Sequence, residues 1–279
     1  MKELQGEVIQ SVGTVRNYEQ SLKTVAAWSA ENRIEGGLRG MTPEIASQYL
    51  HERAESVGQS TLNQERQAIQ SMMQSVTGKL AQGERLEVVN SELQQAQTSR
   101  AYTREQVALV AQAQSDRNAL ATEIAHAAGL RAHELHTLRP AGERAADERP
   151  ADSDKFSGRD GQIYTVEGKG GLCREVLIPN DLAARLEERK LETPANITDR
   201  GVFYTSHYDI GGGNALSSSF SAASERSLGW SEGLHGLRHS YAQERMSELQ
   251  RSLTREDALR IVSQELGHFR SEITEVYLR

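Results

Sequence analysis

The chain has 279 residues, of which 37% are hydrophobic and 25% are charged, and its formal net charge at pH 7 is −7. This length suits two domains, the composition indicates a polar, helix-rich protein, and no apolar run approaches the roughly 20 residues of a transmembrane helix. The first ten residues lack the apolar core of a signal peptide. The single cysteine, Cys173, excludes an intrachain disulfide and fits the cytoplasm. The acidic balance counts against an indiscriminate nucleic-acid binder, but it is compatible with a specific binder that has a basic channel.

Residues 1–82 predict an all-helical N-terminal domain. Apolar residues recur at helical spacing over 11–33, and a glycine-rich stretch ends that helix. Thr42 and Pro43 supply an N-cap and a first-turn proline for a second helix. A third helix is expected over 60–77.

A polar, glutamine-rich stretch over 83–102 predicts a linker to a second domain, at 103–279. Apolar periodicity, caps and glycine stops predict a series of helices in this domain. They are expected at 103–114, 116–128, 181–191, 215–228, 237–253, 254–266 and 271–279. The sequence therefore predicts a mainly α protein with a small β-hairpin or sheet, in the α+β class.

Four further features of the second domain bear on function. Gly129 ends one helix, and a new helix should begin near Arg131, where a helix N-terminus would favour a phosphate. Residues 139–160 are polar and predict a mobile surface loop. Residues 162–178 predict a β-hairpin with Lys169 at its tip, and a short strand is expected near 201–208.

The last fifth of the chain gathers cationic and nucleophilic side chains. His235, Arg238, His268 and Tyr277 lie within 43 positions, and Arg131 and Lys169 stand in marked settings upstream. Two arginine forks can clamp the non-bridging oxygens of a phosphodiester, where negative charge develops during attack. A lysine or histidine can protonate the leaving 5′ oxygen. A tyrosine whose phenol is assisted by cations and a base can attack the phosphorus without a metal.

These residues stand in five motifs whose order and spacing resemble the tyrosine recombinase/integrase family. The motifs are GLRxxEL around Arg131, GKGG around Lys169, HGLRHSYA around His235 and Arg238, LGH ending at His268, and Tyr277 nine residues later. The resemblance is clear over about 103–277 and extends plausibly over 1–90. It implies a helical N-terminal core-binding bundle and a catalytic domain that together form a C-shaped clamp around DNA.

The resemblance also implies an activity and its partners. Tyr277 would form a 3′-phosphotyrosine while Arg131, Arg238, His235 and His268 hold the phosphate and Lys169 protonates the leaving oxygen. Two rounds would exchange strands at specific sites in double-stranded DNA through a Holliday junction, with a dimer on each site and a tetramer in synapsis. Accessory DNA-bending proteins would be further partners. We expect neither a cofactor nor a membrane partner, and the resemblance implies a bacterial mobile element or a phage as the source.

Supporting roles are expected for further residues. Glu134 and His239 are expected to buttress the site, with His239 facing elsewhere on its helix. DNA contacts are expected from exposed polar and basic residues of the first domain and the linker: Gln59, Ser60, Thr61, Asn63, Gln64, Arg66, Gln67, Lys79, Arg85 and Arg100. A solvated helix face would look the same.

Three alternatives remain open at this stage. A type IB topoisomerase or a telomere resolvase would use the same chemistry without exchange between sites, and an integrase-derived DNA-binding protein would not cut at all. A zinc site at His133 and His136 is disfavoured because these residues lack the HExxH spacing.

The sequence ends two residues after Tyr277, whereas many relatives continue into a segment that docks on a neighbouring protomer. We therefore expect another surface to join protomers unless the sequence is truncated.

Overall fold

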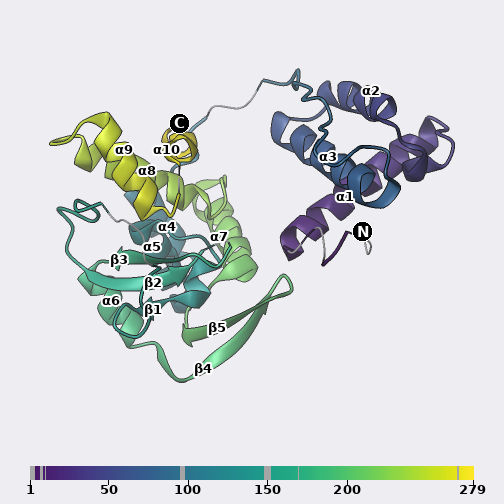
Figure 1. Cartoon of the computed structure of the whole chain (residues 1–279). Coiled ribbons are helices and arrows are strands. Elements are labelled where there is room, and N and C mark those ends of the chain that lie inside the picture. Colours follow the sequence, from purple (N-terminus) through teal and green to yellow (C-terminus); the bar gives the residue numbers. More distant parts are fainter. Residues whose placement is uncertain are drawn as a thin grey trace. The chain divides into compact units, whose positions relative to one another are not determined.

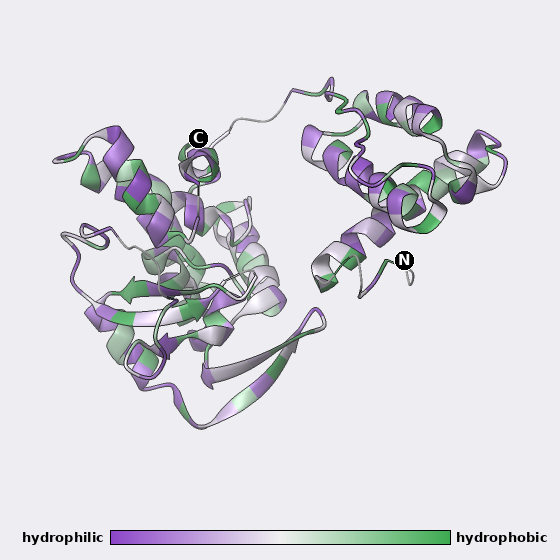
Figure 2. Cartoon of the chain, in the orientation of Figure 1, coloured by the Kyte–Doolittle hydropathy of each residue, from purple (hydrophilic) through white to green (hydrophobic). Residues whose placement is uncertain are grey.

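The computed structural model describes residues 4–6, 9, 11–94, 98–147, 152–168, 170–268 and 270–279. The chain divides into two compact units, Met1–Gln97 and Thr98–Arg279 (Figure 1). Helices of both units alternate between hydrophobic and hydrophilic positions along their length, as expected when one face of each helix is buried (Figure 2). Within the described part of the chain, no helix combines the length and apolar character that a membrane span requires.

The N-terminal unit is a bundle of three helices. They are α1 (Val12–Glu31), α2 (Pro43–Ala54) and α3 (Gln59–Met72), the last continued by a π-helical turn at Met73–Thr77. The hydroxyl of Thr42 accepts a hydrogen bond from the Ile45 amide, so the predicted N-cap of the second helix is confirmed. The core of the unit is built from residues of all three helices, among them Val25, Tyr49 and Ile69.

Part of segment 83–102 packs against this bundle. Leu86 and Val89 are buried in the core of the N-terminal unit. The side chain of Gln59 donates to the carbonyl of Val89 at 3.0 Å and accepts from the amide of Ser91 at 2.8 Å. Arg66 donates to the Leu86 carbonyl at 3.2 Å. The first half of this segment is therefore held to the first unit by both apolar and polar contacts.

The C-terminal unit is built around helices that carry or support the candidate site. They are α4 (Arg104–Gln112), α5 (Asp116–Ala128), α6 (Asn180–Glu187), α7 (Gly213–Leu228), α8 (Gly236–Leu249), α9 (Arg255–Glu265) and α10 (Ser271–Glu275). A reciprocal capping box between Thr103 and Gln106 starts α4. Short 3-10 turns follow α5, at Glu134–Thr137 (η3), and α10, at Val276–Leu278 (η4).

Two small antiparallel sheets complete this unit. β1 (Arg139–Pro140), β2 (Gln162–Glu167) and β3 (Cys173–Ile178) form the first sheet in that order, and β4 (Lys190–Asp199) pairs with β5 (Val202–Tyr208) in the second. The predicted hairpin over 162–178 is confirmed, with Gln162 paired to Ile178 and Glu167 to Cys173. The predicted fold class, mainly α with small β elements, is also confirmed.

One predicted helix was wrong, and a second was predicted to end too late. The stretch after Gly129 forms only the four-residue turn η3 and then enters β1, because Pro140 disfavours a helical conformation at Arg139. The helix expected over 181–191 ends at Glu187, because Lys190 already pairs with Tyr208 in the second sheet. The whole of β4 was missed, since its partner strand lies beyond a turn and its sequence is polar with one proline.

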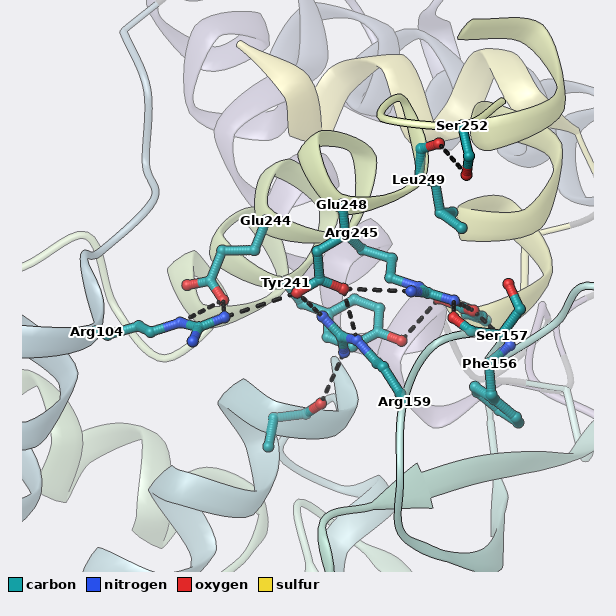
Figure 3. Close-up of polar contacts among 12 residues, drawn as sticks. Arg104, Phe156, Ser157, Arg159, Tyr241, Glu244, Arg245, Glu248, Leu249 and Ser252 are labelled. Atoms are coloured by element: carbon teal, nitrogen blue, oxygen red, sulfur yellow. Dashed lines mark hydrogen bonds and ion pairs between the residues drawn. The ribbon is translucent and has the colours of Figure 1, made fainter. Parts of the chain in front are cut away.

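The expected mobile loop over 139–160 is also tied down where it is described. Arg159 donates to both carboxylate oxygens of Glu248 on α8, at 2.8 and 3.0 Å, and Arg245 donates to the carbonyl of Ser157 at 3.0 Å (Figure 3). The amide of Phe156 donates to Glu265 at 2.9 Å. These contacts fasten the stretch from 156 to 159 to helices α8 and α9.

Candidate active site

Five separate parts of the C-terminal unit converge on one point. The stretch from the end of α5 into η3 carries Arg131 and Glu134, and β3 carries Arg174. The start of α8 carries His235, Arg238 and His239, the turn after α9 carries His268, and η4 carries Tyr277. As far as the structure describes the predicted catalytic residues, it brings them together at this point. Lys169, predicted at the tip of the hairpin, lies outside the described residues.

Glu134 is the centre of this cluster. It is fully buried, and its carboxylate accepts hydrogen bonds from the side chain and amide of Arg131 and from Arg174, each at 2.8 Å. Nη1 of Arg238 lies 3.9 Å from Oε2 of the same carboxylate. Burial alone would raise the pKa of Glu134, but the charges of Arg174, Arg238 and Arg131 outweigh it and lower the pKa to about 2. Glu134 is therefore an anion that orients three guanidinium groups.

Arg238 is held rigidly at the start of α8. Its side chain is fully buried and donates to the carbonyls of Gly129 and Leu266 and to Nε2 of His268, the last at 3.2 Å. Burial, aided by the charge of Arg131, lowers its pKa to about 10 against the opposing effect of Glu134, so Arg238 stays charged at neutral pH. Its Nε has no partner within the described residues. A quarter of the Arg131 side chain is exposed.

The hydroxyl of Tyr277 lies beside a histidine. Nε2 of His235 is 3.1 Å from Oη of Tyr277, and the tyrosine is 8% exposed. Gln243 on α8 donates to the carbonyls of Tyr277 and Arg279 at 3.2 and 2.8 Å, which fixes the end of the described chain. Desolvation and the charge of Arg238 lower the pKa of His235 to about 4. The imidazole is therefore neutral at pH 7 and able to accept the phenolic proton.

Two more histidine rings pack around Tyr277. The ring of His239 lies 4.7 Å from the ring of Tyr277, and that of His268 lies at 5.2 Å. The expectation that His239 faces elsewhere on α8 was therefore wrong: the turn η4 docks on the side of the helix where this residue lies. Desolvation and neighbouring arginines lower the pKa of His239 to about 4 and that of His268 to about 3, so both rings are neutral at pH 7.

Two residues of the cluster were not predicted. Arg174 is almost fully buried, and besides Glu134 it bonds the carbonyl of Glu265 at 2.8 Å. An arginine inside the otherwise largely apolar strand CREVLI was a signal that could have indicated it. Thr274, also fully buried, bonds Nδ1 of His268 at 2.8 Å, and no sequence pattern singled it out.

Some of the predicted DNA-contact residues line a surface concavity or are exposed, whereas others are bonded to other parts of the protein. A concavity of about 460 Å³ on the N-terminal unit is lined by polar side chains of α1 and α3: Thr14, Asn17, Tyr18, Ser60, Asn63, Gln64 and Gln67. Gln59 and Arg66 are instead bonded to the packed segment described above. Thr61, Lys79 and Arg85 are exposed, and Arg100 is exposed but paired with Glu232 at 3.3 Å.

Metal-ligand clusters were also considered. In the described ranges, no group of three or more histidine, cysteine and acidic residues is arranged to hold a metal ion. His133 and His136 both lie against the ring of Tyr204, at centroid distances of 6.4 and 5.5 Å. Their setting is that of packed aromatic side chains.

No model of a protein family matches this chain, and no curated protein matches it by sequence. Solved structures do match. A dimer of a lambda integrase fragment bound to a COC′ core site has a TM-score of 0.62 at 15% identity, covering 100% of this chain and 92% of that chain. XerH site-specific recombinase bound to palindromic difH substrate has a TM-score of 0.57 at 15% identity, covering 95% and 74%. The integrase of transposon Tn1549, in complex with a circular intermediate DNA, has a TM-score of 0.51 at 12% identity, covering 95% and 94%. The chain therefore has the fold of the tyrosine recombinases.

Proposed function

We propose that this protein is a site-specific DNA recombinase that cleaves and rejoins DNA through a 3′-phosphotyrosine. The observation that carries the proposal is the position of Tyr277, whose hydroxyl lies 3.1 Å from the neutral imidazole of His235, beside Arg238. Attack on a phosphodiester requires a nucleophile, a base and fixed cations, and this site contains all three.

In this mechanism Arg131 and Arg238 hold the two non-bridging oxygens of the scissile phosphate. His235 takes the phenolic proton as Oη of Tyr277 attacks the phosphorus, and the bond to the 5′ oxygen breaks. That oxygen leaves as a hydroxyl, with its proton supplied by Lys169, whose role stays a prediction. Return attack by the 5′-hydroxyl of a partner strand releases Tyr277 and rejoins the DNA. The energy of the broken bond is kept in the phosphotyrosine, so neither ATP nor a metal is needed.

The assembly on DNA is proposed by analogy with the structures of similar fold. Lambda integrase has been crystallised as a dimer on a core site and as a tetramer on a Holliday junction. We propose the same sequence of assemblies here, with the N-terminal unit contacting DNA through the polar concavity that includes Ser60, Asn63 and Gln67. Phosphate contacts by Lys79, Arg85 and Arg100 would add affinity without sequence preference.

Trapping of covalent protein–DNA adducts tests the proposal directly. Cells that carry the DNA flanking this gene would be lysed in denaturant with EDTA, and adduct junctions sequenced. We expect adducts from the wild type and from Tyr204→Phe, a matched control on β5, and none from Tyr277→Phe. Adducts that survive Tyr277→Phe would exclude Tyr277 as nucleophile. A folded wild-type protein that binds the flanking DNA without forming adducts would favour a DNA-binding protein that does not cut.

A second measurement separates recombination from the same chemistry on one duplex. Supercoiled plasmids carrying one or two copies of the trapped site would be incubated with the protein. We expect exchange products only from the plasmid with two sites. Relaxation of the plasmid with one site, without exchange on the other, would favour a topoisomerase-like enzyme.

A further inference from the structure

A chain of side-chain hydrogen bonds runs from the candidate active site into the protein interior. Nε2 of His268 lies 3.2 Å from Nη2 of Arg238, and its Nδ1 lies 2.8 Å from Oγ1 of Thr274. Thr274 is fully buried, and its hydroxyl also lies 2.8 Å from Oγ of Ser263. Ser263 donates to the carbonyl of Leu259, one turn earlier on α9, at 2.6 Å.

The direction of each hydrogen bond follows from the chemistry of its members. A guanidinium can only donate, so Nε2 of His268 must be the acceptor and the hydrogen of the neutral ring must sit on Nδ1. Thr274 therefore accepts from Nδ1. Thr274 and Ser263 share a further hydrogen bond, and the hydroxyl of Ser263 also lies within hydrogen-bond distance of the carbonyl of Leu259, which can only accept.

We propose that Thr274 is a positioning residue that, together with Arg238, fixes the ring orientation and the tautomer of His268. Thr274 belongs to α10 and stands three residues before Tyr277. Ser263 belongs to α9, and its carbonyl also accepts the backbone amide of His268 at 2.8 Å. The relay therefore joins the helix before His268 to the helix that leads into Tyr277.

This arrangement has two consequences for the site. With Nδ1 committed to Thr274, the ring can gain a proton only at Nε2, the nitrogen that faces Arg238. A phosphate oxygen that displaced the Arg238 contact would thus meet a hydrogen-bond donor once Nε2 is protonated. In addition, any displacement of α10 carries Thr274 along with Tyr277, so His268 is held in this orientation only while the tyrosine is in place. The catalytic meaning of both points rests on the proposed recombinase function, but the tautomer and its anchor do not.

Ring-nitrogen NMR on the full-length chain tests the proposal without any DNA. Correlation spectra that link histidine ring protons to ring nitrogens report which nitrogen carries the hydrogen, and His268→Gln would assign the signals of this residue among the eight histidines. We expect the wild type to show the Nδ1–H tautomer with a slowly exchanging ring N–H. The conservative variant Thr274→Ser should keep both signatures. Thr274→Val, which has nearly the same shape but no hydroxyl, should lose the slow ring N–H signal.

The outcomes are decisive in either direction. An Nε2–H tautomer of His268 in the wild type would overturn the proposal by itself. This result needs no variant, so it remains available even if Thr274→Val fails to fold. A slow Nδ1–H signal that persists in folded Thr274→Val would overturn it as well.

Activity then tests the catalytic meaning separately. Once a cleavable site is known, we expect Thr274→Val to cleave about tenfold more slowly than Thr274→Ser, the effect of one buried hydrogen bond. Suppose that Thr274→Val loses the ring N–H signal but cleaves as fast as Thr274→Ser. Thr274 would then still be the residue that holds the His268 tautomer, but that tautomer would have no role in cleavage. If adduct trapping yields no cleavable site, the result counts against the recombinase proposal while the NMR result stands.

Discussion

The buried carboxylate of Glu134 allows a quantitative test of how the cationic cluster is held together. We predict that Glu134→Gln destabilises the C-terminal unit by about 3 kcal/mol at pH 7. The pKa of Glu134 falls from 4.5 to about 2 in the folded protein, and each pKa unit corresponds to about 1.4 kcal/mol. Removal of one partner from a buried ion pair costs a similar amount, about 3–5 kcal/mol. Glutamine also offers one acceptor oxygen where the carboxylate uses two, so an amide N–H would face an arginine donor.

Each compact unit contains one tryptophan, which makes the measurement specific. Trp28 lies on α1 and Trp230 lies between α7 and α8, where its ring stacks on Tyr102 at 5.0 Å. In a Trp28→Phe background, urea unfolding followed by fluorescence therefore reports on the C-terminal unit alone, and the two units need not unfold together. Glu143→Gln is the matched control, because Glu143 pairs with Lys190 at the surface and its loss should change stability little.

The pH dependence supplies an independent check. The pKa of Glu134 is lower in the folded protein than in the unfolded chain. The contribution of its carboxylate to the free energy of unfolding is therefore fully present above the unfolded pKa near 4.5, and it is lost as the pH falls toward 2. The stability gap between the parent and Glu134→Gln should therefore shrink to about half or less by pH 3. A gap below about 1 kcal/mol at pH 7, or one that stays constant down to pH 3, would refute the view that three arginines stabilise this carboxylate.

Two further predictions concern the packing and the titration of the site. Gly129 and Gly229 both end helices at positive φ, 62° and 79°, but a Cβ on Gly129 would lie 2.8 Å from the ring of Tyr241, whereas one on Gly229 would meet nothing within 4 Å. Alanine at Gly229 should cost about 1 kcal/mol, alanine at Gly129 at least 1 kcal/mol more, and equal losses in urea unfolding would contradict this packing. The lowered pKa values of His239 and His268, about 4 and 3, mean that the unfolded chain binds protons first, so stability is complete above pH 6.5 and falls below it. By pH 5 the loss should reach at most about 2 kcal/mol per histidine, and a flat stability profile between pH 7 and pH 5 would show that these rings are not desolvated.

The parts of the site that could be predicted are those in which a short stretch carries its own signal. His235 and Arg238 precede and begin an apolar-periodic helix, and the structure places them at the start of α8 as expected. Gly129 ends α5 at positive φ, which only glycine adopts at low cost, and so marks the turn that presents Arg131. In each case local backbone chemistry and the functional residue lie within a few positions of one another.

The parts that could not be predicted depend on contacts between distant stretches. Arg174 acquires its role from Glu134, 40 positions earlier, and from a carbonyl 91 positions later. The strand β4 exists because β5 pairs with it, and its proline lies where the register shifts between Lys190 and Ala195. His239 could not be placed because the periodicity of its own helix does not reveal where the turn carrying Tyr277 docks.

The charge of the cluster also explains why an acidic chain can suit a phosphate substrate. The net charge of −7 describes the whole molecule, whereas Arg131, Arg174 and Arg238 surround one ionised carboxylate and leave two positive charges at the site. The neighbouring histidines are neutral at pH 7 before attack, and in the proposed mechanism His235 becomes positively charged only as it takes the phenolic proton. A phosphodiester carries one negative charge, and attack by a phenolate raises it to about two in the transition state. Because the two positive charges match the transition state better than the ground state, the proposed substrate would be stabilised most at the point where catalysis requires it.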